Sequence, residues 1–261
     1  MGGRKITVNG VFFDLFGTLL IYGSMEQAWS DWLSEFHSRL KQNGLTMPQE
    51  KFARCCNGFF TRKAPKKGND NFTVYELRIR DLCNGLNLSV EPEEIKKIAG
   101  NTAAIWQKQI LLAPNATGVL KEIKQSKVVG LITNFDHPPH IYKLITQTGL
   151  EPLLDVVVIS GEVELKKPDP GIFHIALEKT GLKPHEVVYV GDTDEDVTGA
   201  QAASIVPIRI QRRVPVKNGY AYDFDLDESK NAYNRNSDSQ EPSNVCTMPI
   251  RLTQVYLVPQ D

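Results

Sequence analysis

Two apolar segments that each end on an aspartate constrain the fold of this chain more than any other feature. Residues 11–20 read VFFDLFGTLL, so an apolar, β-prone run ends at Asp14 and turns at Gly17. Residues 187–196 read VVYVGDTDED, a second apolar run that ends on a glycine followed by Asp192. Carboxylates delivered by strand ends are typical of the carboxyl edge of a parallel sheet, where ligand sites form. The pattern therefore predicts a site at this edge, with Asp14 as a nucleophile or a metal ligand.

The chain beyond Ala113 alternates between helical and strand-like stretches. Helices are predicted at 115–125, 138–148, 169–180 and 194–203, and strands at 127–132, 154–159, 186–190 and 205–210. Alternation of this kind predicts parallel strands joined by crossover helices on both faces of the sheet. The first strand, 6–13, must join the same sheet. The predicted fold class is therefore α/β.

Residues 21–112 have a different character, because their apolar residues recur at the helical period. Helices are predicted at 24–42, 48–62, 72–86 and 91–112, with Ser24 placed to cap the first. This predicts an all-helical cap domain at 21–112, inserted into a core formed by 1–20 and 113–261. Within that core, the polar segment 217–244 is predicted to be a flexible insert, and 248–258 a returning strand.

Charge and cysteine content argue against several classes of function. The 261 residues carry a formal net charge of −1, which gives no electrostatic basis for binding nucleic acid or a membrane surface. No apolar run approaches the roughly 20 residues of a membrane helix. The N-terminus lacks the apolar core of a signal peptide, and the four cysteines have no metal-like spacing. We therefore expect a cytoplasmic protein with no nucleic-acid or membrane partner; the sequence predicts no oligomeric state.

Four short motifs follow one another along the chain. They are Asp-x-x-Gly-Thr-Leu from Asp14, Thr133-Asn134, Lys167-Pro168-Asp169-Pro170, and Gly191-Asp192-x-x-x-Asp196. In this order they resemble the motifs of the haloacid dehalogenase-like (HAD) hydrolases, over roughly residues 8 to 210. The resemblance implies a Rossmann-like parallel-sheet core with a helical cap inserted after the first motif. It also implies a Mg²⁺-dependent hydrolase acting on a small phosphorylated substrate.

The resemblance assigns the carboxylates to a nucleophile and a metal site. Asp14 is the expected nucleophile, which attacks phosphorus to give a covalent aspartyl-phosphate that water then hydrolyses. Mg²⁺ prefers hard oxygen ligands, and Asp14, Asp192 and the backbone carbonyl of Phe16 would hold it. Asp196 would act from behind these ligands, orienting the metal's water or a lysine. Taken alone, the same aspartates also suit ordinary turn and helix capping.

Four more positions are expected to complete the site. Lys167 would offset the repulsion between the carboxylates and a phosphate and stabilise charge in the transition state. Thr133, expected to be catalytic, and Asn134 would bind a phosphoryl oxygen. Thr18 would contact the substrate or position the nucleophile. A solvated lysine before a proline turn, and plain turn chemistry at the other three positions, remain the alternatives.

Other polar and aromatic side chains have weaker claims to a function. His137 and His140 either act as a base or simply begin a helix. The basic loop 61–68 either meets an anionic substrate or is solvated. Three aromatic residues at helical spacing are expected to form the cap core, and one of them can line the crevice: Trp29, Trp32 and Phe36.

Phe16 departs from the pattern of the family's phosphatases. Those enzymes usually carry a second aspartate there, which protonates the leaving oxygen and later activates water, at a gain of roughly 10²–10⁴-fold in rate. Three functions stay open: a phosphohydrolase, a dehalogenase whose halide leaves unprotonated, and a non-catalytic HAD-fold binding protein. The phosphohydrolase would be slow on alkyl phosphates, would act on substrates with good leaving groups such as acyl or aryl phosphates, or would take its acid from the cap. Dehalogenases of the family need no metal and typically lack an acid at the position of Asp192. Its presence therefore favours the phosphohydrolase.

Overall fold

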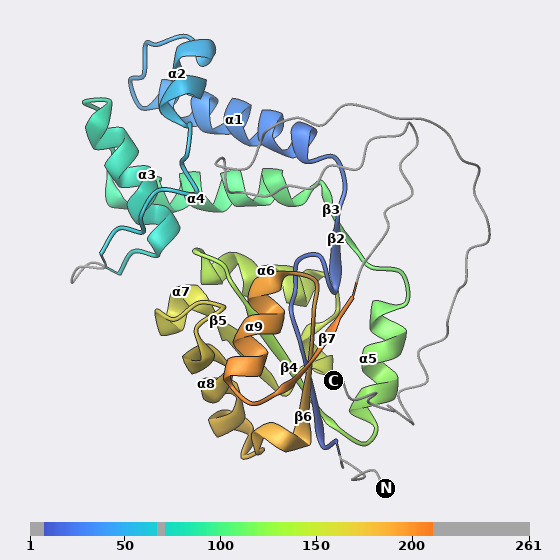
Figure 1. Ribbon diagram of the computed structural model, residues 1–261. Coiled ribbons are helices and arrows are strands. Elements are labelled where there is room, and N and C mark those ends of the chain that lie inside the picture. Colours follow the sequence, from blue (N-terminus) through green and yellow to red (C-terminus); the bar gives the residue numbers. More distant parts are fainter. Residues whose placement is uncertain (1–7, 67–70, 211–261) are drawn as a thin grey trace, which may run out of the picture. The chain divides into compact units, whose positions relative to one another are not determined.

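A five-stranded parallel sheet forms the centre of the α/β core (Figure 1). The computed structural model describes residues 8–66 and 71–210. The strands lie in the order β5-β4-β1-β6-β7, and each neighbouring pair is parallel. Their bounds are β1 Gly10–Phe13, β4 Val128–Thr133, β5 Val156–Ile159, β6 Val187–Gly191 and β7 Val206–Arg209. The predicted α/β class with a Rossmann-like sheet is confirmed.

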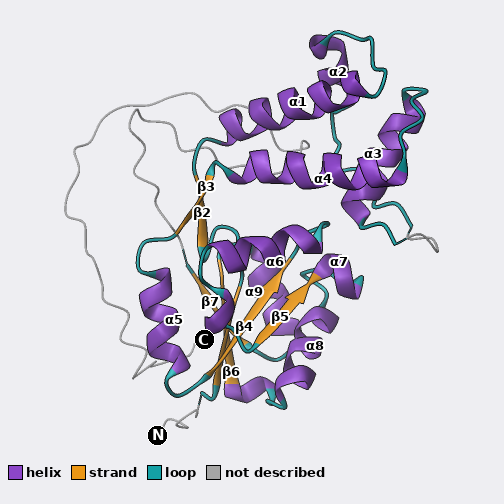
Figure 2. Ribbon diagram, turned by 180° about the vertical axis from the view of Figure 1, so that it is seen from behind, coloured by secondary structure: helices purple, strands orange, loops and turns teal. Residues whose placement is uncertain are grey.

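Helices cover both faces of this sheet (Figure 2). On one face, Phe12, Ile132 and Tyr189 of the strands form a core cluster with residues of α8 and α9. Side chains alternate along a strand, so their neighbours in sequence point to the opposite face, where α5 packs on β4. The helices of the core are α5 Ala116–Lys124, α6 Pro138–Gln147, α7 Ser160–Val163, α8 Pro170–Thr180 and α9 Asp194–Ala202, with 3₁₀ turns at Glu151–Leu153 and Pro184–Glu186.

Strand β1 lies in the middle of the sheet, where the order in which the chain adds strands changes from one side to the other. Gly10 pairs with Val128 of β4 on one side and with Val187 of β6 on the other. The chain adds β5 beyond β4 and then returns to add β6 and β7 on the other side of β1. In open α/β sheets, ligands bind outside the carboxyl ends of the strands at such a reversal. Asp14 directly follows β1 and therefore lies at that position.

Four helices and a two-stranded antiparallel ribbon lie between β1 and α5 in the part of the chain that the structure describes. Ser24 caps α1 by accepting a hydrogen bond from the Gln27 N–H, and Thr73 with Glu76 forms a capping box on α3. These side chains satisfy backbone donors that a helix start otherwise leaves unpaired. The elements are β2 Leu20–Tyr22, α1 Met25–Gln42, α2 Gln49–Cys55, α3 Val74–Gly85, α4 Pro92–Gln107 and β3 Ile110–Leu112.

The helical insert has a hydrophobic core of its own. Trp32, Phe36 and Phe52 are at most 1% exposed and belong to a cluster formed only by residues of the insert. Trp29 stacks on Trp32 with ring centroids 4.9 Å apart, but it remains 36% exposed. A separate core of this kind supports the proposed division into a cap at 21–112 and a core domain.

Two predicted helices are shorter than their sequence patterns indicated. The helix expected at 91–112 ends at Gln107, and Ile110–Leu112 pairs with Leu20–Tyr22 as a strand. A short apolar run suits either structure, and here the long-range partner decides. The helix expected at 48–62 ends at Cys55, and Gly58 adopts a φ of +68° that a helix excludes. The predicted insert 217–244 and strand 248–258 lie outside the described residues.

Candidate active site

Lys167 joins two carboxylates at the carboxyl edge of the sheet. Its Nζ lies 2.5 Å from Oδ1 of Asp14 and 2.5 Å from Oδ1 of Asp196. All three side chains are almost fully buried. They come from three different places in the chain: the end of β1, the segment before α8, and the first turn of α9. The structure therefore brings together the predicted nucleophile, the predicted lysine and the last aspartate of the fourth motif.

Asp196 is held by a dense set of hydrogen bonds. Its Oδ2 accepts hydrogen bonds from the N–H groups of Asp192 and Thr193 and from the Thr193 hydroxyl. The Tyr189 hydroxyl lies 2.9 Å from Oδ1 and accepts a hydrogen bond from Lys167 Nζ at 3.0 Å. These contacts fix Asp196 beside the lysine, and its orienting role stays a prediction. Sequence reasoning missed Tyr189, although its place two residues before Gly191 on an alternating strand was a usable signal.

Asp192 lies next to the turn that follows Asp14. Thr18 donates a hydrogen bond to Oδ1 of Asp192 at 3.4 Å. A Cβ on Gly17, whose φ is +84°, would lie 2.1 Å from Oδ2 of Asp192, so only glycine lets the two segments approach this closely. One carboxylate oxygen each of Asp14, Asp192 and Asp196 lies within 4.8 Å of the other two. Hard oxygen atoms in such a group suit Mg²⁺, which takes one or two carboxylates and keeps several waters.

The charged groups of the site shift one another's pKa values. Burial raises the pKa of Asp14 to about 7, although Lys167 opposes the shift. Burial and the charge of Asp196 also raise the pKa of Asp192. At Asp196, Lys167 and the hydrogen bonds outweigh burial and lower the pKa. Burial alone would lower the pKa of Lys167, but the two carboxylates raise it, so the lysine stays charged. A bound cation would offset the same crowding of negative charge.

Thr133 presents a buried hydroxyl whose hydrogen bonds are not satisfied. It ends β4, beside β1, and is 1% exposed. Among the described residues, its Oγ1 has no hydrogen-bond partner. Buried polar atoms are nearly always paired, so an exception calls for an explanation. A phosphoryl oxygen would satisfy this hydroxyl, as the sequence motif predicted.

The side chain of Asn134 is engaged within the protein. Its Nδ2 donates to the carbonyl of Lys167 at 3.0 Å and lies 3.2 Å from Oε2 of Glu195, and its Oδ1 accepts from the Lys167 N–H at 2.8 Å. This pair of backbone hydrogen bonds clamps the segment that carries the lysine. Both polar atoms of this amide are thus engaged within the protein, and its contact with a substrate stays a prediction. We also propose that Asn134 positions Lys167.

Phe16 belongs to a group of aromatic rings beside the nucleophile. Its ring stacks on Phe135 with centroids 5.4 Å apart and an interplanar angle of 22°. Tyr22 lies 6.4 Å away in a stacked arrangement, and Trp106 lies 6.0 Å away at 57°. The sequence did not connect the rings of Tyr22, Trp106 and Phe135 with the site, because the three residues come from segments far apart in the chain.

The two histidines after Asn134 face the insert. Thr73 Oγ1 lies 3.0 Å from Nδ1 of His137, and the Tyr75 N–H donates to the carbonyl of Asp136 at 3.1 Å. His140 Nε2 lies 3.3 Å from Oε1 of Gln107, at the end of α4. Both histidines are buried, and these contacts join the helical insert to the loop after β4. The contacts therefore favour a structural role for both side chains.

His140 should make folding stability sensitive to acid. Burial, with help from His137 and Lys143, lowers its pKa to about 4, below the usual value of 6.5. The stabilisation is therefore fully present above pH 6.5 and is lost as the pH falls toward 4. Between pH 7.5 and pH 5, this shift corresponds to about 2 kcal/mol. From pH 7.5 to pH 5, the free energy of unfolding measured in urea should therefore fall by about 2 kcal/mol more in the wild type than in His140→Gln. Equal losses in the two proteins would contradict the assignment.

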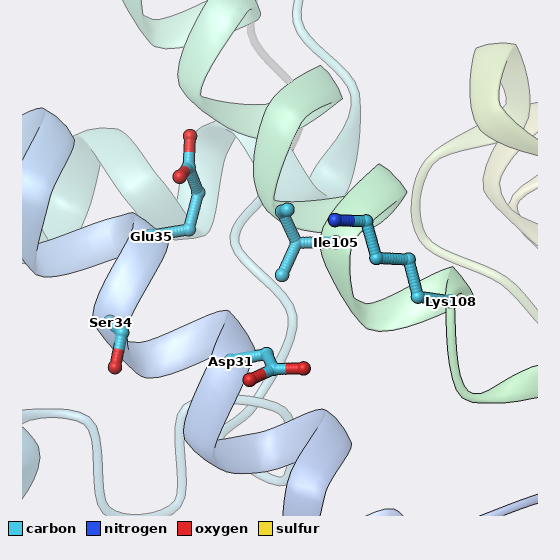
Figure 3. A pocket seen from close by; sticks show the side chains of 5 residues that line it. All are labelled: Asp31, Ser34, Glu35, Ile105 and Lys108. Carbon is cyan, nitrogen blue, oxygen red and sulfur yellow. The ribbon is translucent and has the colours of Figure 1, made fainter.

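The helical insert also carries a surface hollow between α1 and α4 (Figure 3). It is lined by Asp31, Ser34, Glu35, Ile105 and Lys108, none of which belongs to the four motifs. In the predicted basic loop, Arg62 donates to the carbonyls of Cys55 and Asn57. Lys67 lies outside the described residues. Among the described helices, none is long and apolar enough to cross a membrane.

Comparison with known proteins agrees with this geometry. The family model of the haloacid dehalogenase-like hydrolases matches residues 8–204. A glyceraldehyde 3-phosphate phosphatase of Methanopyrus kandleri is 36% identical over 95 residues, 34% of this chain and 41% of that protein. A phosphoglycolate phosphatase of Yersinia pestis is 33% identical over 93 residues, 35% of this chain and 40% of that protein. Both matches thus span only about two fifths of the relatives' length.

The fold itself recurs in solved structures. The crystal structure of a HAD phosphatase from Thermococcus onnurineus superimposes with a TM-score of 0.55 at 20% identity. The superposition covers 83% of this chain and 90% of that one. At this level of identity the likeness concerns the fold, and the chemistry must be argued from the residues of the site.

Proposed function

Because the chain belongs to the haloacid dehalogenase-like hydrolases, we propose that it is a Mg²⁺-dependent phosphohydrolase acting on a small phosphorylated metabolite. Asp14 attacks phosphorus, the bond from phosphorus to the leaving oxygen breaks, and an aspartyl-phosphate forms. Water then attacks this phosphorus, which releases inorganic phosphate and restores the carboxylate. Phosphatases among the relatives support this reaction class.

One observation carries this function: Asp192 is present and close to Asp14. A nucleophile that displaces halide needs neither a second carboxylate nor a cation beside it. Here carboxylate oxygens of Asp14, Asp192 and Asp196 lie within 4.8 Å of one another, while one lysine ammonium neutralises only part of their charge. This excess negative charge supports a bound divalent cation.

The protein's own groups have separate tasks in this reaction. Lys167 pairs with Oδ1 of Asp14, which orients the carboxylate and leaves Oδ2 as the proposed attacking atom. Thr133 is proposed to donate its unpaired hydroxyl to a phosphoryl oxygen. Asp14, Asp192 and the backbone carbonyl of Phe16 would hold Mg²⁺, which supplies positive charge that offsets the charge on the phosphoryl group.

Removal of the metal tests this function directly. We expect EDTA to abolish phosphate release from a panel of alkyl, aryl and acyl phosphates, and Mg²⁺ to restore it. Asp192→Asn should raise the half-saturating Mg²⁺ concentration by about 10–100-fold or more, because a ligand is lost. Asp194→Asn is a matched control, since Asp194 is largely exposed and pairs with Arg209.

Other outcomes would select the alternatives. Halide release from a 2-haloacid that survives EDTA would identify a dehalogenase. Thermal stabilisation by phosphorylated ligands without any turnover would identify a binding protein. Either result would contradict the phosphohydrolase.

A further inference from the structure

Four aromatic rings lie together beside the candidate site. Phe16 is at their centre and contacts Phe135, Tyr22 and Trp106, with ring centroids 5.4–6.4 Å apart. We call these four residues the aromatic cluster. Phe16 follows Asp14 by two residues, and Phe135 follows Thr133 by two. Two members of the cluster therefore leave the same strand ends that carry the nucleophile and the unpaired hydroxyl.

The other two rings come from the insert. Tyr22 ends β2, and Trp106 lies in the last turn of α4, so both are in the segments that lead into and out of the cap. The contact between Tyr22 and Phe16, which follows Asp14 by two residues, brings Tyr22 near the candidate site.

The aromatic cluster is more exposed than the buried aromatic core of the cap, against which Trp106 also packs. Trp32, Phe36 and Phe52 are at most 1% exposed, whereas Tyr22 is 37% exposed and the other three rings are half-buried. Burying apolar surface stabilises a folded protein, so apolar rings that stay in contact with water do not contribute that stabilisation. Exposed apolar groups that gather in a contiguous patch often mark a binding surface. Here the patch borders the nucleophile.

We propose that the aromatic cluster is the leaving-group subsite and that the substrate is an aryl phosphate, which rests on the phosphohydrolase function proposed above. Asp14 attacks phosphorus and the phosphorus–oxygen bond breaks. The bonding electrons leave on the aryl oxygen, and solvent protonates the aryloxide after it departs. The flat ring of the leaving group stacks against the rings of the cluster.

The absence of an acid at Phe16 independently points to the same leaving group. A phenol has a pKa of about 10, whereas an alkyl alcohol resembles water, whose pKa is about 16. An aryloxide can therefore leave without a proton donor, but an alkoxide cannot leave easily. The substitution of phenylalanine for aspartate thus removes an acid that an aryl phosphate does not need, and it adds a ring that such a substrate can contact.

Three phosphate esters separate ring recognition from leaving-group ability. Benzyl and cyclohexylmethyl phosphate both release an alkyl alcohol, but only the first has an aromatic ring. Phenyl phosphate has the ring and releases an aryloxide. With Mg²⁺ present, we expect KM for benzyl phosphate to be about tenfold below that for cyclohexylmethyl phosphate. We expect kcat for phenyl phosphate to exceed that for benzyl phosphate by about 10²-fold or more.

Variants in two different elements then locate the subsite. Phe135→Leu and Trp106→Leu should each abolish the KM difference between benzyl and cyclohexylmethyl phosphate, while both variants keep an apolar side chain for folding. Tyr22→Phe keeps the ring and should keep that difference. Tyr142→Leu is the matched control, since Tyr142 lies on α6, is 42% exposed and donates a hydrogen bond to Glu162.

The failures of the two proposals are distinguishable. Phosphate release with the same KM for benzyl and cyclohexylmethyl phosphate would overturn the subsite and leave the phosphohydrolase intact. Loss of benzyl but not phenyl phosphate turnover in Tyr22→Phe would identify Tyr22 as a proton donor and overturn unassisted departure. No release from any ester would overturn the phosphohydrolase itself.

Discussion

Asp14→Asn is expected to lower phosphate release by about 10⁴–10⁶-fold, the scale observed when a covalent nucleophile is removed. The amide has nearly the size of the carboxylate but cannot attack phosphorus. Burial raises the pKa of Asp14 to about 7, so the fold already accommodates a neutral side chain there near neutral pH. Activity should therefore fall without unfolding. The measurement is kcat for phenyl phosphate with saturating Mg²⁺, beside the thermal unfolding midpoint.

A matched control separates this effect from a general loss of charge. Asp81 lies on α3 in the cap, and its side chain is 54% exposed. Asp81→Asn should retain wild-type turnover. If Asp14→Asn kept more than about one hundredth of the activity, the nucleophile would have to be sought elsewhere.

Phe16→Asp is expected to raise turnover of alkyl phosphates by about 10²-fold, at the lower end of the gain from a positioned general acid. The substitution places a carboxyl group two residues after the nucleophile and leaves the backbone carbonyl of residue 16 as a metal ligand. It also removes the central ring of the aromatic cluster. We therefore expect the preference for aromatic substrates to weaken while alkyl substrates gain. The measurement is kcat and KM for benzyl, cyclohexylmethyl and phenyl phosphate.

Phe16→Leu is the control for this prediction. Leucine removes the ring without supplying an acid, so it should weaken the preference for aromatic substrates but give no gain on alkyl phosphates. A new acid in the mechanism should also add a limb to the pH–rate profile of Phe16→Asp that Phe16→Leu lacks. If Phe16→Asp bound Mg²⁺ normally and gave no gain, the missing acid would not be what limits this site.

Much of the core and the location of the site could be predicted from local patterns. Alternating strands and helices predicted a parallel sheet, and the carboxyl ends of parallel strands meet at one edge however the helices pack. Asp14, Lys167 and Asp196 consequently lie together as expected. Ser24 and the helical spacing that follows it predicted α1, because capping and amphipathic periodicity depend on residues within a few positions of one another.

The contacts that give the site its particular character were decided by tertiary structure alone. Asn134 clamps the backbone of Lys167, Tyr189 joins Lys167 to Asp196, and Ile110–Leu112 forms a strand because Leu20–Tyr22 lies beside it. Likewise, Phe16 meets Phe135 because the strands that precede them, β1 and β4, pair side by side. Local periodicity specifies which face of an element a side chain occupies. Which distant side chain it meets depends on the packing of whole elements, a sum of many weak contacts that no short segment encodes.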